Sequence, residues 1–441
     1  MSNFFEYNQD ELECKYNILV WPNITYSKDL EKDSFVVVLH NTIKELNKKI
    51  PGLFWTIVTP YTTKSLEFPN SEQVIYDLPS YPNSMRVHFD VNKVLDILDW
   101  RNKDFDILYS LLPEHTLQLT NLIYNQTNLR PKVLGQCHWY EIKENTMYEK
   151  TTFNQNILGT LEMEECGVNS IWLKNLILDR CKELFSKEII DKLSTIIQPH
   201  YLGTRINNSI ILPKIPKSIL FNHRPNEYTG WNDFIKTMDK LYDKRKDFTV
   251  YVTLADEIRP YIKKVNLNKE EYNKFLTSML IGVGYFKDYS AWSISVTDGL
   301  SAKLPYLLPN KLCYPEMVGG DYPLFYENES EFLSKLENIL DNGTESYNVN
   351  FDEILEKLSW EFTVSKWFNG WDIFNSLPIL KSKTESYMEI YDFIKSRGCV
   401  SKHDIMNKLK WGMNIPFSPY RNTLRTEKNI KFVKNGYQYT N

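Results

Sequence analysis

Short apolar runs that alternate with helix-patterned segments constrain the fold of this chain most strongly. Tyr16–Trp21 (YNILVW), Leu53–Thr59 and Phe105–Ser110 are apolar enough for buried strands, and amphipathic segments separate them. Strands that are buried on both faces and joined through helices form a parallel sheet. The alternation continues to about Gln198, so this part of the chain predicts one helix-covered parallel sheet.

The same alternation begins again near Lys217. Ser218–Asn222 (SILFN) and Phe248–Leu254 (FTVYVTL) predict strands, and Trp231–Tyr242 predicts the helix between them. A chain of 441 residues is also too long for one ordinary core. We therefore expect an α/β protein with two Rossmann-like domains that face each other across a cleft, residues 1–205 and 206–380. Ligands of such sheets bind at the carboxyl ends of the strands.

Charge and cysteine content exclude several classes of protein. The net charge is −4, so the overall charge of the chain does not favour binding to nucleic acid. The six cysteines are scattered and form no CxxC pair, which argues against a zinc site and for reduced thiols. The first residues are polar and acidic, unlike a signal peptide, and no apolar run approaches the ~20 residues of a membrane span. We expect a cytoplasmic protein that binds no metal.

The last 60 residues depart from this pattern. Ser382–Asn441 contains eleven Lys or Arg and five Asp or Glu, which gives +6 in a chain that is acidic elsewhere. Glu385–Arg397 predicts a helix, Ser401 can cap a second, and Ser418-Pro419 can open a third that runs to about Lys428. Asn435-Gly436 then predicts a hairpin between Ile430–Val433 and Tyr437–Thr440. Three helices and a hairpin predict a winged helix-turn-helix domain at 381–441.

The third of these helices has the properties of a DNA-recognition helix. Phe417, Tyr420 and Leu424 form its apolar stripe, and polar side chains lie largely on the other side. Two lysines of the hairpin would bring the wing to phosphate. The predicted DNA-binding residues are Arg421, Asn422, Arg425, Lys428, Lys431 and Lys434. Winged helices also mediate protein contacts, so that alternative stays open.

Two segments of the second domain predict a nucleotide site. Arg224 follows the strand that ends at Phe221-Asn222, where its planar fork suits a diphosphate. Downstream, a helix is predicted to open on Thr297-Asp298-Gly299, so that Asp298 can grip ribose hydroxyls. The N–H groups of Gly299, Leu300 and Ser301 would then bind phosphate at the helix N-terminus. Alternatively, Arg224 is a surface side chain and Asp298 an ordinary helix cap.

One acid/base pair stands out in the first domain. His138 and Glu141 follow the predicted strand Lys132–Cys137 (KVLGQC). A histidine in that place can act as a general acid or base, but it can equally be a structural hydrogen-bonding group.

Together, the segments Ser218–Met238 and Tyr289–Tyr322 resemble the donor-binding part of nucleotide-sugar glycosyltransferases of the GT-B fold. The resemblance covers roughly Tyr16 to Phe374. It implies that Asn222, Arg224, Asp298 and Glu316 (of Pro315-Glu316) bind the donor. It also implies that His138 contacts the transferred sugar, with Glu141 beside it. A nucleotide-diphosphate sugar, with a UDP-sugar favoured, would be the co-substrate, and transfer would be retaining and metal-independent, with no bound cofactor.

The chain departs from this family pattern at two positions. Thr229-Gly230 stands where the family has Lys-Gly, so a phosphate-binding cation is missing, for which Lys274, Lys287 or His223 could compensate. Ser290 stands where many members have an acid that contacts the sugar.

A sugar transferase joined to a DNA-binding module resembles the bacteriophage enzymes that glycosylate modified DNA bases. This resemblance implies transfer to a hydroxyl on a 5-hydroxymethylpyrimidine in double-stranded DNA, in the host cytoplasm if the protein is viral. Two alternatives stay open: a glycosyltransferase acting on polysaccharide or protein, and a catalytically inactive DNA-binding adaptor.

Overall fold

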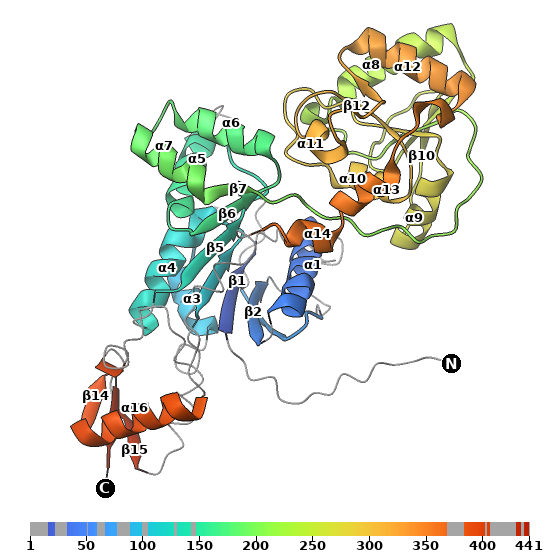
Figure 1. Ribbon diagram of the computed structural model, residues 1–441. Coiled ribbons are helices and arrows are strands. Elements are labelled where there is room, and N and C mark those ends of the chain that lie inside the picture. Colours follow the sequence, from blue (N-terminus) through green and yellow to red (C-terminus); the bar gives the residue numbers. More distant parts are fainter. Residues whose placement is uncertain are drawn as a thin grey trace, which may run out of the picture. The chain divides into compact units, whose positions relative to one another are not determined.

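The computed structural model describes residues 16–22, 33–50, 52–59, 67–76, 89–98, 105–127, 130–142, 147–367, 383–401, 404–405, 429–433 and 436–440. Its contacts divide the chain into two compact units (Figure 1). Unit 1 comprises Met1–Gly167, Ile177–Gln198 and Trp367–Asn441, and unit 2 comprises Val168–Leu176 and Pro199–Lys366.

A seven-stranded sheet with the order β3-β2-β1-β4-β5-β6-β7 forms the centre of the first part of the chain. The pairings from β3 through β6 are parallel. In Figure 1, α1 lies on one side of this sheet and α4 and α5 on the other, as right-handed crossovers require. The strands are β1 (Tyr16–Trp21), β2 (Leu53–Thr59), β3 (Ser71–Ile75), β4 (Ile107–Ser110), β5 (Lys132–Gln136), β6 (Glu165–Val168) and β7 (Ile197–Pro199). The helices are α1 (Ser34–Lys49), α3 (Val91–Ile97), α4 (Pro113–Thr127), α5 (Met147–Thr160), α6 (Ile171–Cys181) and α7 (Lys187–Ile196).

Unit 2 is built on a six-stranded sheet with the order β10-β9-β8-β11-β12-β13. Every pairing in it is parallel. Its strands are β8 (Ser218–Phe221), β9 (Thr249–Val252), β10 (Ile262–Lys264), β11 (Ile281–Val283), β12 (Tyr306–Pro309) and β13 (Phe325–Tyr326). Its helices are η2 (Glu227–Thr229), α8 (Trp231–Lys244), α9 (Lys269–Ser278), α10 (Ile294–Ser301), α11 (Tyr314–Val318), α12 (Glu329–Asn342), η3 (Glu345–Tyr347), α13 (Phe351–Lys357) and α14 (Trp360–Val364).

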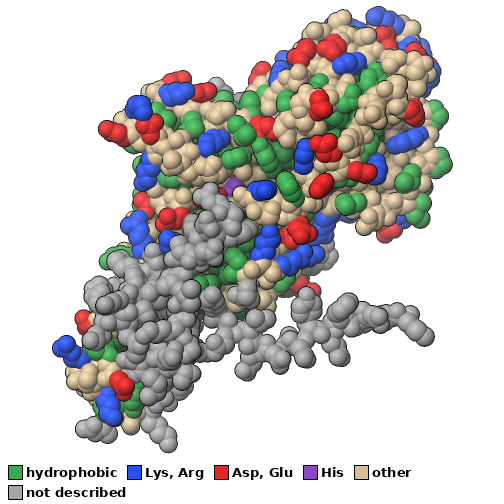
Figure 2. All heavy atoms as spheres, in the orientation of Figure 1, with side chains coloured by type: hydrophobic (Ala, Val, Ile, Leu, Met, Phe, Trp, Pro, Cys, Tyr) green, Lys and Arg blue, Asp and Glu red, His purple; other side chains and the backbone are tan. Residues whose placement is uncertain are grey.

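The two sheets share one strand order, in which the third strand in sequence is at one edge and the fourth lies beside the first. This is the order of dinucleotide-binding doubly wound sheets. The prediction of two Rossmann-like sheets is confirmed. On the face shown in Figure 2, acidic and basic side chains are interspersed over unit 2, in agreement with exposed pairs such as Lys240–Glu329.

The C-terminal segment forms a small sheet of its own. Its elements are α16 (Lys383–Arg397), β14 (Cys399–Ser401), β15 (Ile430–Val433) and β16 (Gly436–Tyr439), with the antiparallel order β14-β16-β15. The predicted first helix and the hairpin strands are present. Ser401 caps the turn after β14, because its Oγ accepts a hydrogen bond from the N–H of Asp404 at 3.0 Å. A separate apolar core holds these elements together: Ile390, Ile394, Val400, Ile405, Ile430 and Tyr437.

Candidate donor site

Helix α10 begins earlier than the sequence predicts. Ser293 is its N-cap: the Ser293 carbonyl accepts from Thr297 N at 3.1 Å, and its Oγ accepts from Val296 N at 3.4 Å. The predicted helix start at Thr297 is therefore wrong. The prediction failed because the β-branched Ile294 and Val296 and the polar Ser295 are weak helix formers, whereas Thr297 and Asp298 are residue types that favour a helix N-cap.

This earlier start moves the anion-binding end of the helix. The first-turn N–H groups without an intrahelical partner are those of Ile294 and Ser295. Gly299, Leu300 and Ser301 lie in the last turn, where an α-helix uses its N–H groups internally. These three residues therefore do not form the helix N-terminus that was predicted to bind phosphate.

Gly299 has a packing role instead. A Cβ added at Gly299 would lie 2.3 Å from the ring of Tyr306, and one added at Gly282 would lie 2.4 Å from the same ring. The two glycines therefore make room for this fully buried tyrosine between β11 and α10.

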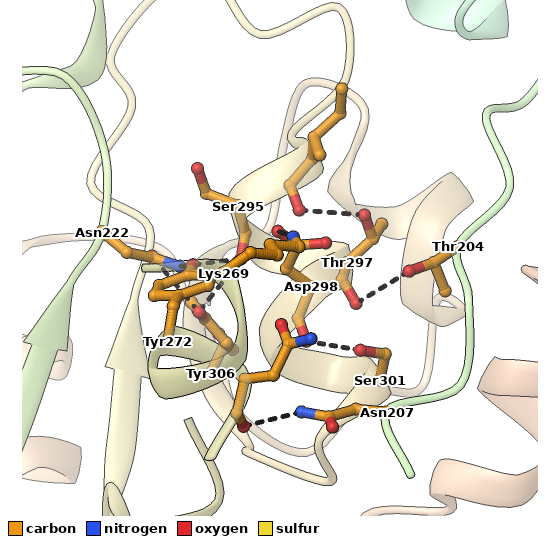
Figure 3. A network of polar contacts seen from close by, with 12 residues as sticks. Thr204, Asn207, Asn222, Lys269, Tyr272, Ser295, Thr297, Asp298, Ser301 and Tyr306 are labelled. Atoms are coloured by element: carbon orange, nitrogen blue, oxygen red, sulfur yellow. Dashed lines mark hydrogen bonds and ion pairs between the residues drawn. The ribbon is translucent and has the colours of Figure 1, made fainter. Parts of the chain in front are cut away.

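Asn222, the residue after β8, organises a buried polar network (Figure 3). Its Nδ2 donates to the hydroxyl of Tyr272 at 2.8 Å and to the carbonyl of Ser295 at 2.9 Å. The hydroxyl of Tyr306 lies 3.2 Å from both Asn222 Oδ1 and the Ser295 carbonyl. The network thus ties the carboxyl end of β8 to the first turn of α10. Asn222, predicted as a donor ligand, uses its amide to position α10.

Asp298 lies on the following turn of α10, and 26% of its side chain is exposed. Burial raises the pKa of this carboxyl, and nearby Lys269 acts in the opposite direction. Lys269 Nζ lies 3.4 Å from Asp298 Oδ2 (Figure 3). The carboxylate is half-buried, with a cation beside it, and retains capacity to accept further hydrogen bonds.

Arg224 extends from a loop whose backbone is fixed. Its carbonyl accepts from Asn226 N at 2.9 Å and from Thr229 Oγ1 at 2.7 Å. The side chain is exposed, and within the part of the chain that the structure describes its guanidinium has no ion pair or hydrogen bond. The fork is therefore available to an anion two residues after Asn222.

The three residues proposed to replace the missing cation differ in their suitability. His223 is buried, its Nε2 lies 3.1 Å from the Val283 carbonyl, and burial lowers its pKa to about 4. It is therefore neutral at pH 7 and cannot serve as that cation. Lys274 pairs with Glu270 at 2.6 Å, and Lys287 pairs with Asp233 in the first turn of α8.

Glu316 is held by the protein itself. Its carboxylate accepts from the N–H groups of Ile171 at 2.6 Å and Trp172 at 2.8 Å, and from the hydroxyl of Tyr201 at 3.1 Å. It thus caps the start of α6, where a carboxylate also complements the helix dipole. The hydrogen bonds to α6 and Tyr201 account for the position of Glu316 without a ligand, and its contact with the donor stays a prediction.

His138 and Glu141 lie after β5 in unit 1. The ring of His138 contacts the ring of Phe35 edge-on at 4.6 Å. Glu141 accepts from Trp139 Nε1 at 3.2 Å, and its backbone N–H donates to Asn156 Oδ1 at 3.3 Å. Both side chains are partly exposed, although the Nε2 atom of His138 is itself buried, and their catalytic role stays a prediction.

Of the predicted DNA-binding residues, Lys431 is exposed on β15. Arg421, Asn422, Arg425, Lys428 and Lys434 lie outside the described residues. Within the described ranges, no group of three or more His, Cys, Asp or Glu could hold a metal ion, and no helix there is long and apolar enough to span a membrane.

Sequence reasoning missed Lys269, Tyr272, Ser295 and Tyr306 as members of this site. Their positions relative to Asn222 depend on the pairing of β8 with β11 and of β11 with β12. No local spacing could reveal this, although glycines within a strand and a helix, here Gly282 and Gly299, can indicate that another group packs closely against the backbone.

No protein-family model and no curated protein matches the sequence. Solved structures match over most of it. Sucrose-phosphate synthase from Thermosynechococcus elongatus has a TM-score of 0.62 at 10% identity, covering 82% of this chain and 100% of that chain. HepE from Anabaena, solved with UDP and glucose, has a TM-score of 0.57 at 9% identity with the same coverage. A trehalose-6-phosphate synthase studied for glycosyl transfer with retention has a TM-score of 0.58 at 11% identity, again covering 82% and 100%. Two parallel sheets of the same strand order and this likeness show that the chain has the GT-B fold.

Proposed function

We propose that the protein is a glycosyltransferase that takes a sugar from a nucleotide-diphosphate sugar, with a UDP-sugar favoured. The observation that carries the proposal is that an available guanidinium and a half-buried carboxylate lie on two elements that one buried polar network joins. Arg224 follows β8, Asp298 lies on α10, and the Asn222 network joins the two elements. The solved complex of HepE with UDP and glucose supports this proposal.

In the proposed reaction, the bond between the anomeric carbon and the β-phosphate oxygen breaks. The nucleoside diphosphate leaves with the electron pair, and an acceptor hydroxyl forms the new bond as it loses its proton. Arg224 and the N–H groups of Ile294 and Ser295 stabilise the negative charge that develops on the diphosphate. Asp298 accepts hydrogen bonds from the ribose hydroxyls. His138, with Glu141 beside it, is the candidate for proton transfer or sugar contact, and the reaction is retaining and metal-independent.

The acceptor we propose is the hydroxyl of a 5-hydroxymethylpyrimidine in double-stranded DNA. The C-terminal segment supports it, because a helix followed by the strand order β14-β16-β15 around its own core suits a winged helix. Exposed Lys431 on β15 would then contact phosphate, as would Lys434 in the wing. Arg421, Asn422, Arg425 and Lys428 would lie on the recognition helix.

Two other functions have observations in their favour. The names of the sucrose-phosphate and trehalose-6-phosphate synthases point to carbohydrate acceptors. An inactive adaptor would explain why Thr229 stands in place of the lysine of the family pattern. It would also explain why Ser290 stands in place of the acidic residue; the Ser290 hydroxyl lies 3.5 Å from Cys313 Sγ.

A panel of nucleotide sugars, incubated with the protein and with hydroxymethylated DNA, unmodified DNA or polysaccharide, tests these functions. Mass spectrometry of nucleosides should show a sugar on the hydroxymethylated base alone. Donor hydrolysis without DNA-dependent transfer would favour a different acceptor, and the absence of both would favour the adaptor.

A further inference from the structure

The first residue of α9 carries a cation where the helix itself disfavours one. Lys269 lies at the positive end of the helix dipole, which destabilises a positive charge. A capping box fixes it there: Asn268 Oδ1 accepts from Glu271 N at 3.0 Å, and the Glu271 carboxylate accepts from Asn268 N at 2.9 Å. The ion pair with Asp298 gives a reason for this placement.

The other groups around Asp298 do not supply a positive charge. Tyr272 on α9 and Tyr306 on β12 face it, and burial raises the pKa of both hydroxyls, so they stay neutral. Lys303, after α10, pairs at 3.0 Å with Asp352 of the neighbouring helix α13. Among the described residues, Lys269 is therefore the cation that contacts Asp298.

We propose that Lys269 is a positioning residue of the donor site, which holds the Asp298 carboxylate in place and ionised so that it can accept the ribose hydroxyls. This inference rests on the proposed function of Asp298. Lys269 acts through Asp298 and need not touch the donor: its side chain is 70% exposed and its ammonium also lies 5.5 Å from the Tyr272 ring centre.

The expected pH dependence follows from the charges. Burial raises the pKa of Asp298 and Lys269 opposes that rise. Without Lys269 the pKa rises further, so the carboxylate becomes protonated at a higher pH. A protonated carboxyl is a weaker acceptor than a carboxylate. Nucleotide binding should therefore weaken on the acid side sooner in a variant that lacks this cation.

Calorimetric titration with UDP from about pH 5 to about pH 9 tests the proposal. Lys269→Met should weaken UDP binding by about two- to fivefold near neutral pH, the range of a partly exposed ion pair. The difference from wild type should widen as the pH falls and close as it rises. Lys269→Arg should restore the wild-type profile. Lys240→Met is the matched control, because Lys240 lies on α8 of the same unit, outside the proposed site, and pairs with Glu329 at 2.6 Å.

If Lys269→Met weakens UDP binding equally at every pH, Lys269 binds the donor directly and the proposal is wrong. A pH profile identical to that of wild type would also overturn the proposal. If wild type binds no nucleotide, the proposed function fails by itself, and urea unfolding still tests Lys269. An acid whose pKa is raised by folding costs stability above its unfolded pKa. Lys269→Met should therefore lose stability relative to wild type as the pH rises from acid to neutral, because the unfavourable helix-dipole effect on Lys269 is the same at both pH values. A difference in unfolding free energy between the two proteins that does not change with pH would overturn the inference independently of nucleotide.

Discussion

The two sheets have the same strand order, yet the residues at their strand ends are held differently. At the end of β8 in unit 2, the Asn222 side chain makes hydrogen bonds to three other elements, α9, α10 and β12. At the end of β5 in unit 1, His138 contacts Phe35 through a ring contact, and Glu141 accepts from its near neighbour Trp139.

One strand order can therefore support two kinds of site. A buried network that joins several elements fixes backbone and carboxylate before a ligand arrives, as electrostatic stabilisation of a leaving group requires. The His138 and Glu141 side chains are instead partly exposed on a loop, as contact with an acceptor requires. We therefore expect substitutions in unit 2 to affect donor chemistry strongly.

The largest effect is expected from Arg224→Ala. A cation that meets charge developing on the diphosphate contributes most in the transition state, so kcat should fall by roughly 10²–10³. Steady-state kinetics with a UDP-sugar measures this. Arg245→Ala is the control, because Arg245 follows the far end of α8 and pairs with Asp247 and Asp341. A rise in KM with unchanged kcat would show that Arg224 binds donor and transition state equally.

Gly299→Ala tests whether packing maintains the network. The new methyl group would meet the buried Tyr306 ring, so the free energy of unfolding should fall by about 1–3 kcal/mol despite the better helix propensity of alanine. Urea unfolding measures it. Gly320→Ala is the matched control, because a Cβ there would have no atom within 4 Å. Equal stability of both variants would mean that the ring yields easily.

The strands could be predicted from the sequence, whereas the network around Asn222 could not. Apolar runs predicted β1 and β2 with their observed bounds, because a strand that is buried on both faces is a nearly continuous run of apolar residues in the sequence. The loop position of Arg224 followed from the end of β8. The start of α10 and the network could not be predicted, because Ser293 competes with Thr297 as a cap, and Asn222, Tyr272 and Tyr306 meet only after the sheet forms.

A smaller effect is expected in the C-terminal segment. Arg421→Ala with Arg425→Ala should weaken binding to long duplex DNA and reduce the slope of log K against log salt by about two. Fluorescence anisotropy at several salt concentrations measures the slope. Donor hydrolysis should stay unchanged, and an unchanged slope would favour protein docking over DNA binding.

We propose that the Arg224–Asp298 region of unit 2 binds a nucleotide diphosphate, and calorimetric titration of wild type and Asp298→Ala with UDP tests this proposal. Loss of a charged hydrogen bond to ribose should weaken binding by about 1.5–3 kcal/mol. Circular dichroism should show an unchanged fold, because the side chain is partly exposed on the surface of α10. Saturable binding by wild type that weakens in this way is the result we predict. UDP binding of equal affinity in both proteins would contradict the assignment of Asp298 and of the site around it.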